Sequence, residues 1–504
     1  MNKGDAIVPT HYERVMEMYR EVSDLYGALA LMGWDQETYM PPKGAAGRGR
    51  QLATLSGMAH ERITSDEMRA ELDAARSESL ADDEEVNIRE IARSSDRAVK
   101  VPVDLVKSIA ETSSAAIGVW IKARKEDDFK AFAPWIDKLV ALQREVAEAV
   151  GYQDEPYDAL LDEYEPYATT KDTAAVFDSI RGPLVDLVQR IASSGVRPRT
   201  DFLERNYPVD DQRRMGVMAA ERMGFDFEAG RLDISPHPFC THMGVQDVRL
   251  TTRYSETLPM QSFYGVIHEA GHGLYEQGHD PVHEGTPRGA SVSLGIHESQ
   301  SRLWENMVGR SRAFWRYFFP EFSAVFPDQA ADVTEEEVYA AVNEVKPSLI
   351  RVEADEITYN LHILLRFEIE RGLFTGEFSA GDLSAVWNEK MKFFLGIEPP
   401  DDRDGVLQDI HWSHGSFGYF PTYTLGNLYA AQFYRAAERD LPGLSEQIAR
   451  GELLPLRNWL RDHIHRPGMT YRAGDLVRHV TGEPLTADCF LAYVDGKYRS
   501  LYRL

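Results

Sequence analysis

The residues with the clearest chemical meaning in this chain form the pattern H-E-x-x-H, made by His268, Glu269 and His272. On an α-helix of 3.6 residues per turn, side chains four positions apart lie on the same face. Both imidazoles can therefore bind one metal ion, while Glu269 can act as a base toward a water molecule there. The pattern indicates metal-assisted hydrolysis, and zinc is the first choice because it accepts nitrogen and oxygen ligands. Two chance histidines on an amphipathic helix are the alternative.

A helix over residues 264–278 must position these side chains. Gly278 is a plausible end for this helix. Its apolar side, which would pack against the rest of the protein, consists of Val266, Ile267, Ala270 and Leu274.

A third metal ligand has to come from elsewhere in the chain. One class of zinc enzymes adds a histidine six residues after the second motif histidine, with a glycine three residues after it. Gly278 and Tyr275 occupy those positions here, which excludes that class. The other main class takes a glutamate from a later helix. Glu298, on a helix expected over residues 293–308, is the candidate.

Two rivals and one simpler interpretation compete with Glu298. His297 is the neighbouring ligand candidate. Glu276 continues the first helix, but it lies two turns from His268, and we expect it to be solvated. In the simpler interpretation, Glu298 is an ordinary polar residue on the surface of a helix.

Helical spacing dominates the rest of the chain, so we expect a mainly α fold in which residues 1–504 form one catalytic unit. Residues 151–170, rich in Tyr, Asp and Pro, are expected to be an irregular surface connection. Residues 231–235 and 246–254 alternate with period two and predict strands, the second at a sheet edge where a peptide could add. The expected helices cover residues 12–31, 46–60, 82–98, 132–146, 172–193, 210–223, 264–278, 293–308, 334–342, 349–370 and 381–395.

The composition excludes several classes of partner. The net charge is −26, from 81 acidic and 55 basic residues, which argues against binding to nucleic acid or to anionic membranes. No run of 18 apolar residues could span a bilayer, and the first residues lack the apolar core of a leader peptide. Only two cysteines occur, Cys240 and Cys489, so we expect a cytoplasmic protein without a disulfide framework.

Motifs along the full length resemble those of the carboxypeptidase Taq family of zinc metallocarboxypeptidases. The matching segments are GWDQETYMPP at 33–42, HPF at 237–239, DVRLT at 247–251, HEAGH at 268–272, HESQ at 297–300, IRVEAD at 350–355 and GVLQDIHW at 405–412. A wider group of zinc peptidases has Glu-x-x-x-Asp on the second helix, but Arg302 takes the place of that aspartate here. The carboxylate that orients a zinc histidine must then come from elsewhere, and Asp355 is our choice.

The resemblance implies a two-lobed helical fold around a deep groove, with a small β-sheet beside the zinc helix, commonly as a homodimer. It implies His268, His272 and Glu298 as metal ligands and Glu269 as the general base. Zinc is the expected metal, and cobalt can serve some relatives. The implied activity is the removal of single residues from peptide C-termini with broad specificity.

The tetrahedral oxyanion of peptide hydrolysis needs a hydrogen-bond donor besides the metal. His411 and Tyr423 are our candidates because related helical zinc peptidases use a His and a Tyr at this spacing of twelve. Tyr419 is a close rival. Alternatively, this aromatic segment only packs the core.

An exopeptidase must also recognise a free carboxylate, for which the arginine fork is well suited. Arg351, expected at the start of a long helix, is the first candidate, and Arg249 and Arg253 on the second strand compete with it. Asp247 and Thr251 share a strand face with Arg249, and they either line the peptide path or stabilise the sheet.

Two other functions fit the same residues. An oligopeptidase or dipeptidyl carboxypeptidase on the same scaffold would use the same metal site. A non-catalytic peptide-binding protein could keep the metal for structure, but it would not need Glu269, because zinc ligation does not use that carboxylate.

Overall fold

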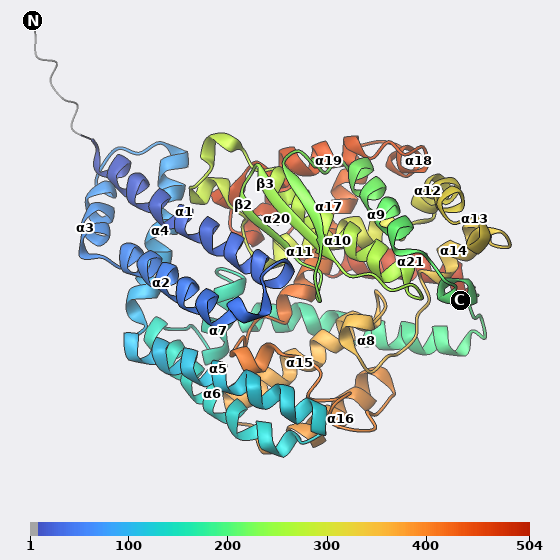
Figure 1. Ribbon diagram of the computed structural model, residues 1–504, viewed down its shortest axis with the longest axis horizontal. Helices are drawn as coiled ribbons and strands as arrows, with labels where there is room; N and C mark the ends of the chain where they lie inside the picture. Colours follow the sequence, from blue (N-terminus) through green and yellow to red (C-terminus); the bar gives the residue numbers. More distant parts are fainter. Residues whose placement is uncertain (1–8) are drawn as a thin grey trace, which may run out of the picture. The chain divides into compact units, whose positions relative to one another are not determined.

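The computed structural model describes residues 9–504 (Figure 1). Residues 1–8, where we expect no apolar leader core, lie outside the described part of the chain. Over residues 9–504 the structure is mainly helical with one three-stranded sheet, which confirms the expected fold class and the small sheet. Within the same residues, no helix is long and apolar enough to cross a membrane.

The chain divides into two compact units, each built from separate stretches of sequence. The first contains residues up to Lys100, Tyr207–Val292 and Leu453–Arg472. The second contains Val101–Asn206, Ser293–Glu452 and Ala473–Leu504. That residues 1–504 act as one catalytic unit remains a prediction.

The first unit combines helices with the sheet. Its helices are α1 (His11–Thr38), α2 (Ala45–Ile63), α3 (Asp66–Ala75), α4 (Asp82–Lys100), α9 (Val209–Met223), α10 (Pro259–Gln277) and α19 (Leu454–Leu460). Its strands are β1 (Gly230–Ile234), β2 (Cys240–Gly244) and β3 (Asp247–Thr252). Short helical turns η1 (Pro42–Gly44), η3 (Pro281–His283), η4 (Pro287–Gly289), η9 (Arg461–His465) and η10 (Gly468–Thr470) complete it.

The sheet has the strand order β1-β3-β2, with β1 parallel and β2 antiparallel to β3. Both predicted strands exist, as β1 and β3. The expectation that the second strand lies at an edge is wrong, because β3 is paired on both sides. The sequence did not reveal β2, in which polar Thr241 and His242 and terminal Gly244 give no alternating apolar pattern.

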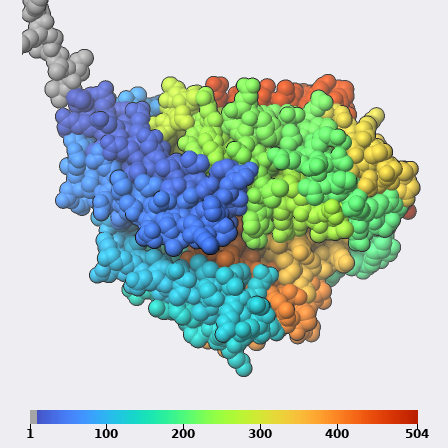
Figure 2. All heavy atoms as spheres, in the orientation of Figure 1, coloured from blue at the N-terminus to red at the C-terminus, as the bar shows by residue number. Residues whose placement is uncertain are grey.

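Helix α10 packs against β2, β3 and α9, so the sheet lies directly beside the helix with the H-E-x-x-H pattern (Figure 1). Gly273 permits this close packing, because a Cβ atom there would lie 2.7 Å from Phe225 and 2.9 Å from Leu250. Helix α1 contacts β2. In the space-filling view, the blue atoms of α1 and α2 adjoin the green atoms of the part of the chain that contains the sheet (Figure 2). The sheet therefore supports α10 through close apolar packing and also through polar contacts, such as the pairing of His242 on β2 with Glu276.

The second unit consists of helices and helical turns. Its α-helices are α5 (Val103–Glu126), α6 (Phe129–Val150), α7 (Pro156–Tyr164), α8 (Thr170–Ser193), α11 (Leu294–Arg302), α12 (Arg312–Val325), α13 (Pro327–Ala330), α14 (Glu335–Ala341), α15 (Thr358–Thr375), α16 (Leu383–Leu395), α17 (Pro421–Asp440), α18 (Leu444–Ala449), α20 (Ala473–Thr481) and α21 (Asp488–Tyr502). The shorter turns are η2 (Asp201–Glu204), η6 (Arg351–Glu353), η7 (Ala380–Asp382) and η8 (His411–His414), and η5 (Leu303–Gly309) is a π-helix.

Two predictions for this unit were wrong. Residues 151–170, expected to be irregular, contain α7, whose start is fixed by Pro156 and by a capping box between Glu155 and Asp158. The helix expected over residues 349–370 begins only at Thr358. The acidic side chain of Asp355 accepts hydrogen bonds from the backbone of Ile357 and Thr358, which caps that helix.

Candidate metal centre and active site

Helix α10 holds the two histidines of the H-E-x-x-H pattern close together. Pro259 occupies its first turn, five residues before the predicted start, and Gly278 follows its last residue, as the sequence predicts. The rings of His268 and His272 have centroids 4.9 Å apart and are nearly perpendicular, at 80°. Glu269, between them in sequence, is 7% exposed. The local helix thus presents two nitrogen ligands and one buried carboxylate.

Glu298 lies on α11, whose start is held by a second buried glutamate. Ser293 caps this helix. Glu165 accepts hydrogen bonds from the Ser293 hydroxyl at 3.0 Å, the Gly295 amide at 2.9 Å and the Tyr429 hydroxyl at 3.0 Å. Burial raises the pKa of Glu165 to about 7, although these donors lower it. Helix α11 is therefore tied by its first turn to the end of α7 and to α17.

The structure brings the predicted metal ligands together. One ligand atom from each of His268, His272 and Glu298 lies within 4.8 Å of the other two. No other group of three or more such side chains meets this distance among residues 9–504. Two imidazole nitrogens and one carboxylate oxygen are a donor set of catalytic zinc sites, so the residues present fit a divalent metal.

The rivals for the third ligand do not join this group. His297 neighbours Glu298 on α11 but contributes no atom to it. We expected Glu276 to be solvated, but this is wrong. Glu276 is only 5% exposed, and its side chain pairs with His242 on β2. The strand that the sequence did not reveal explains the error, since β2 covers the end of α10. Burial, together with the carboxylates of Glu269 and Glu276, raises the pKa of Cys240 well above its ordinary value.

Contacts with Ser301, Arg302 and helix α17 set the position of the Glu298 side chain. The Ser301 hydroxyl donates to Oε2 at 3.3 Å. The Arg302 guanidinium donates from Nε to Glu298 Oε1 at 2.6 Å, so this departure from the wider pattern places a cation beside the ligand. Helix α17 packs closely on α11, and a Cβ atom at Gly426 would lie 2.6 Å from Glu298 Cγ. Glycine at position 426 is therefore required for the observed approach of the two helices.

His411 and Tyr423 also lie together, as expected for a shared role. The Tyr423 hydroxyl is 3.5 Å from His411 Nε2, and the ring of Tyr419 has its centroid 5.4 Å from each of their rings. Tyr423 is one turn before Gly426 on α17, which places this pair near Glu298. Burial lowers the pKa of His411 to about 4 despite the nearby Asp409 carboxylate, so its imidazole is neutral at pH 7.

Arg351 is buried, with 5% of its surface exposed, and it lies in the turn η6 rather than at the start of a long helix. Its Nη1 donates to the Tyr359 hydroxyl at 2.9 Å, and its guanidinium carbon is 5.1 Å from the centroid of the Tyr423 ring. Arg249 on β3 makes two bonds of 2.8 Å to Asp247 and stacks over Trp34 at 4.3 Å. Arg351 is thus the candidate that lies beside the proposed oxyanion donors.

A buried cluster of Arg351, Arg366 and Asp409, the arginine–aspartate cluster, was not found from the sequence. Arg366 is fully buried on α15, and Asp409 lies in the loop before η8. Asp409 belongs to the motif GVLQDIHW, which was the one signal that pointed to it. Asp355, our choice for orienting a zinc histidine, instead uses both carboxylate oxygens to cap α15, and these contacts give that role no support.

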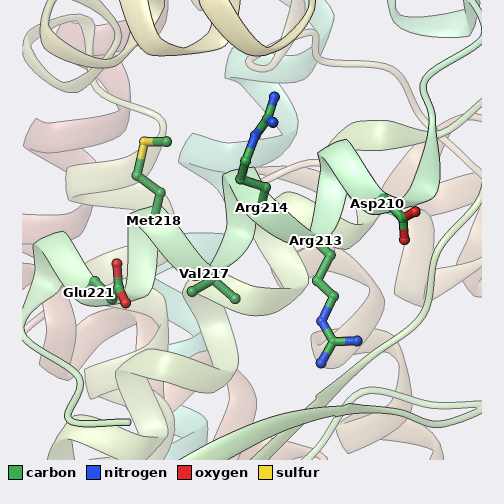
Figure 3. Close-up of a pocket in the computed structure, with 6 residues that line it drawn as sticks. All are labelled: Asp210, Arg213, Arg214, Val217, Met218 and Glu221. Atoms are coloured by element: carbon green, nitrogen blue, oxygen red, sulfur yellow. The ribbon is translucent and has the colours of Figure 1, made fainter.

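A separate surface pocket of about 410 Å³ lies on helix α9. Figure 3 shows the side chains that line it projecting from that helix: Asp210, Arg213, Arg214, Val217, Met218 and Glu221. The charged side chains that line the pocket are exposed and of both signs, and no histidine or cysteine is among the lining residues. Arg214 is paired with Asp211 at 3.2 Å. The pocket therefore carries no catalytic group comparable with those on α10.

Comparisons with known proteins agree along nearly the whole chain. The family model described as Carboxypeptidase Taq (M32) metallopeptidase matches residues 14–498. Thermostable carboxypeptidase 1 of Thermus thermophilus is 46% identical over 97% of this chain and 99% of its own, and carboxypeptidase 1 of Bacillus subtilis is 36% identical over 99% and 100%. The crystal structure of an M32 carboxypeptidase from Deinococcus radiodurans superposes with a TM-score of 0.96 at 41% identity, covering 98% of this chain and all of that one.

Proposed function

The chain belongs to the carboxypeptidase Taq (M32) family of metallopeptidases, and from that premise we propose how its own residues release a C-terminal amino acid. It is a metallocarboxypeptidase that acts on peptides. The single observation that carries the proposal is the group formed by His268, His272 and Glu298, with Glu269 on the same helix.

Zinc is the metal that we propose for this group, with cobalt as an alternative. When bound, such an ion would polarise the scissile carbonyl and make a water molecule more acidic. His268 and His272 would bind through ring nitrogens, and Glu298 through a carboxylate oxygen. Arg302 Nε donates to Glu298 Oε1 and the Ser301 hydroxyl donates to Oε2 at 3.3 Å, so both neighbours hold the carboxylate in place.

Glu269 would act as the general base and then as the general acid. Its carboxylate takes a proton from the attacking water and passes it to the leaving amine. Its low exposure supports this role, since a carboxylate shielded from bulk solvent exchanges its proton with the groups bound in the site rather than with bulk water.

His411 and Tyr423 would stabilise the oxyanion. The neutral His411 imidazole and the Tyr423 hydroxyl each have one N–H or O–H to offer, and their contact of 3.5 Å lets both reach one oxygen atom. Tyr419, packed against both rings, stays the alternative donor. Donors of this kind act strongly because they are already oriented in a site that excludes water.

Arg351 would bind the carboxylate at the end of the peptide, with Arg249 as the alternative. Asp409 and Tyr359 use three of the five N–H donors of Arg351, so two remain for a substrate. Recognition of this carboxylate would give the enzyme its preference for chain ends over internal bonds.

The test is a time course of peptide digestion followed by mass spectrometry, using zinc-loaded protein. We expect a ladder of products that differ by single residues at the C-terminus. Release of dipeptides or cuts at internal bonds would support the alternative dipeptidyl carboxypeptidase or oligopeptidase. Failure of a chelator to stop the reaction would contradict a metal-dependent mechanism.

We propose in addition that residues 1–504 act as one catalytic unit and that the chain assembles as a homodimer, as the family resemblance implies. Light scattering coupled to size-exclusion chromatography measures the assembly directly. A mass near twice the 57.1 kDa of one chain is expected, and a mass equal to one chain would contradict the dimer.

A further inference from the structure

We propose that Asp409 is a positioning residue that holds Arg351 for the substrate carboxylate and faces His411, so that it joins recognition of the chain end to catalysis. The inference rests on the proposed function of Arg351 and His411. It concerns a residue that touches neither the metal ligands nor, on this proposal, the substrate.

The contacts of Asp409 divide between its two oxygens. Oδ1 accepts hydrogen bonds from Arg351 Nε at 3.0 Å and Nη2 at 2.9 Å. Oδ2 accepts from Arg366 Nε at 2.7 Å and lies 2.5 Å from Nη2 of the same residue. Each guanidinium is therefore fixed by two N–H groups, and Asp409 sets the angle at which Arg351 presents its remaining donors.

Arg366 cannot itself turn toward a substrate. Its side chain has no exposed surface, and its Nη1 donates to the His362 carbonyl at 2.8 Å. Its Nη2 donates to Gln408 Oε1 at 2.8 Å, and the guanidinium stacks over the Trp387 ring at 4.7 Å. Arg366 thus anchors Asp409, and only Arg351 has donors left to use.

The charges of the cluster are not balanced. Two guanidinium groups surround one carboxylate. Burial raises the pKa of Asp409, but Arg351 and Arg366 hold it well below its ordinary value, so the carboxylate is charged. The remaining positive charge is buried, which is unfavourable unless an anion pairs with it. The carboxylate of a peptide C-terminus is an anion of the right size, and an amidated or internal peptide group is not.

The same Oδ1 atom faces the proposed oxyanion donor. It lies 3.9 Å from His411 Nδ1, and that nitrogen is buried without a hydrogen-bond partner. This distance is longer than a hydrogen bond, so Asp409 acts on His411 through its negative charge, and the single N–H of the neutral ring stays available on Nε2 for the oxyanion.

The test compares a peptide with a free C-terminus and the same peptide with a C-terminal amide, using wild-type enzyme and the variant Asp409→Asn. In the variant we expect kcat for the free peptide to fall about 100-fold, since a poorly placed catalytic group costs that much. We also expect the preference for the free peptide, as a ratio of kcat/KM values, to fall at least about tenfold. Lost stability alone would lower the active fraction and leave this ratio unchanged.

A double variant, Arg366→Met with Asp409→Asn, removes one charge of each sign and keeps the measurement possible if the single variant does not fold. If Asp409 positions Arg351, the double variant folds but keeps the reduced ratio and the reduced kcat. If either folded variant has the wild-type ratio and kcat, the proposal is overturned. Asp401→Asn, in the same loop and paired with exposed Arg403 at 3.0 Å, is the matched control and should behave as wild type.

Failure of the proposed function gives a different result. In that case the wild-type enzyme itself shows no preference for the free peptide over its amide. If the wild type discriminates and the Asp409 variants discriminate equally well, only the role of Asp409 is wrong.

Discussion

In α10 the chemically active side chains are neighbours in sequence, whereas the arginine–aspartate cluster draws its members from three separate segments. His268, Glu269 and His272 lie within five residues, and the geometry of any α-helix places them correctly. Arg351, Arg366 and Asp409 come from η6, α15 and the loop before η8. Their geometry exists only after the second unit has folded around them.

The difference concerns how each region tolerates change. Replacing a side chain of the motif on α10 removes its chemical function, but the helix itself stays folded. A buried cluster with unequal charges depends on every member, because removal of one partner leaves an unpaired charge inside the protein. Variants of α10 should therefore lose activity and keep their structure, whereas variants of the cluster can lose both.

The largest effect is expected for Glu269→Gln on α10. Loss of the general base should lower kcat by about 10²–10⁴-fold while the protein keeps its metal, since the ligands are untouched. Activity with a peptide substrate and metal content by mass spectrometry check both parts. Glu276→Gln, on the same helix and paired with His242, is the control and should retain most activity. If the Glu269 variant stays active, Glu269 is not the general base.

The next effect separates two tyrosines near the cluster. Tyr423→Phe should lower kcat by about 10²–10³-fold with little change in KM, because one oxyanion donor is lost. Tyr419→Phe is the matched change and should have a much smaller effect. Steady-state kinetics of both variants decide the assignment, and the reverse order of effects would make Tyr419 the donor.

A moderate effect on metal binding is expected for Gly426→Ala. The new methyl group would collide with the Glu298 side chain, so the affinity for zinc should fall about 10–100-fold, as for other changes beside a metal ligand. Competition with a chromophoric chelator measures this affinity. Gly118→Ala on α5, where nothing lies within 4 Å, is the control. Unchanged affinity in the Gly426 variant would contradict the packing of α17 on Glu298.

The smallest effect concerns stability and pH. Burial raises the pKa of Glu370 from 4.5 to about 7, although hydrogen bonds from Tyr157, Gly418 and Trp412 lower it. The folded protein therefore holds this proton more tightly than the unfolded chain. The resulting stabilisation is complete below pH 4.5 and is lost as the pH rises to about 7.

Glu370→Gln should remove this loss, which is on the order of 1–3 kcal/mol between pH 5 and pH 8. Urea unfolding at several pH values measures it, with Glu377→Gln, at an exposed position just beyond the end of α15, as the control. The free energy of unfolding should depend less on pH in the Glu370 variant than in the wild-type protein. Identical pH dependence in the two proteins would show that Glu370 is charged throughout.

The same contrast explains what could be predicted from the sequence. Helical periodicity was sufficient for α10 and for the helix that begins after Thr334, and the need for a glutamate from a later helix led to Glu298 on α11. It failed where the backbone depends on distant partners. β2 lacks alternation because α1 and α10 both contact it. The sequence of α7 and its flanks is rich in turn-forming residues, so the helix was not predicted.

The arginine–aspartate cluster could not be derived from spacing, because 43 residues separate Arg366 from Asp409 and no local rule joins them. The same holds for Glu276, which looked solvated by its helical position and is buried by a strand that sequence alone did not reveal. Residues that share a helix could be assigned early. Residues that meet through tertiary packing required the structure.

The most direct measurement is a crystal structure of the Glu269→Gln variant with zinc and an uncleaved peptide that has a free C-terminus. We expect an anomalous zinc peak bound by His268, His272 and Glu298, at distances of about 2.0–2.2 Å. We expect the terminal carboxylate of the peptide to be paired with Arg351. A zinc peak elsewhere, or a terminal carboxylate bound away from Arg351, would contradict the account.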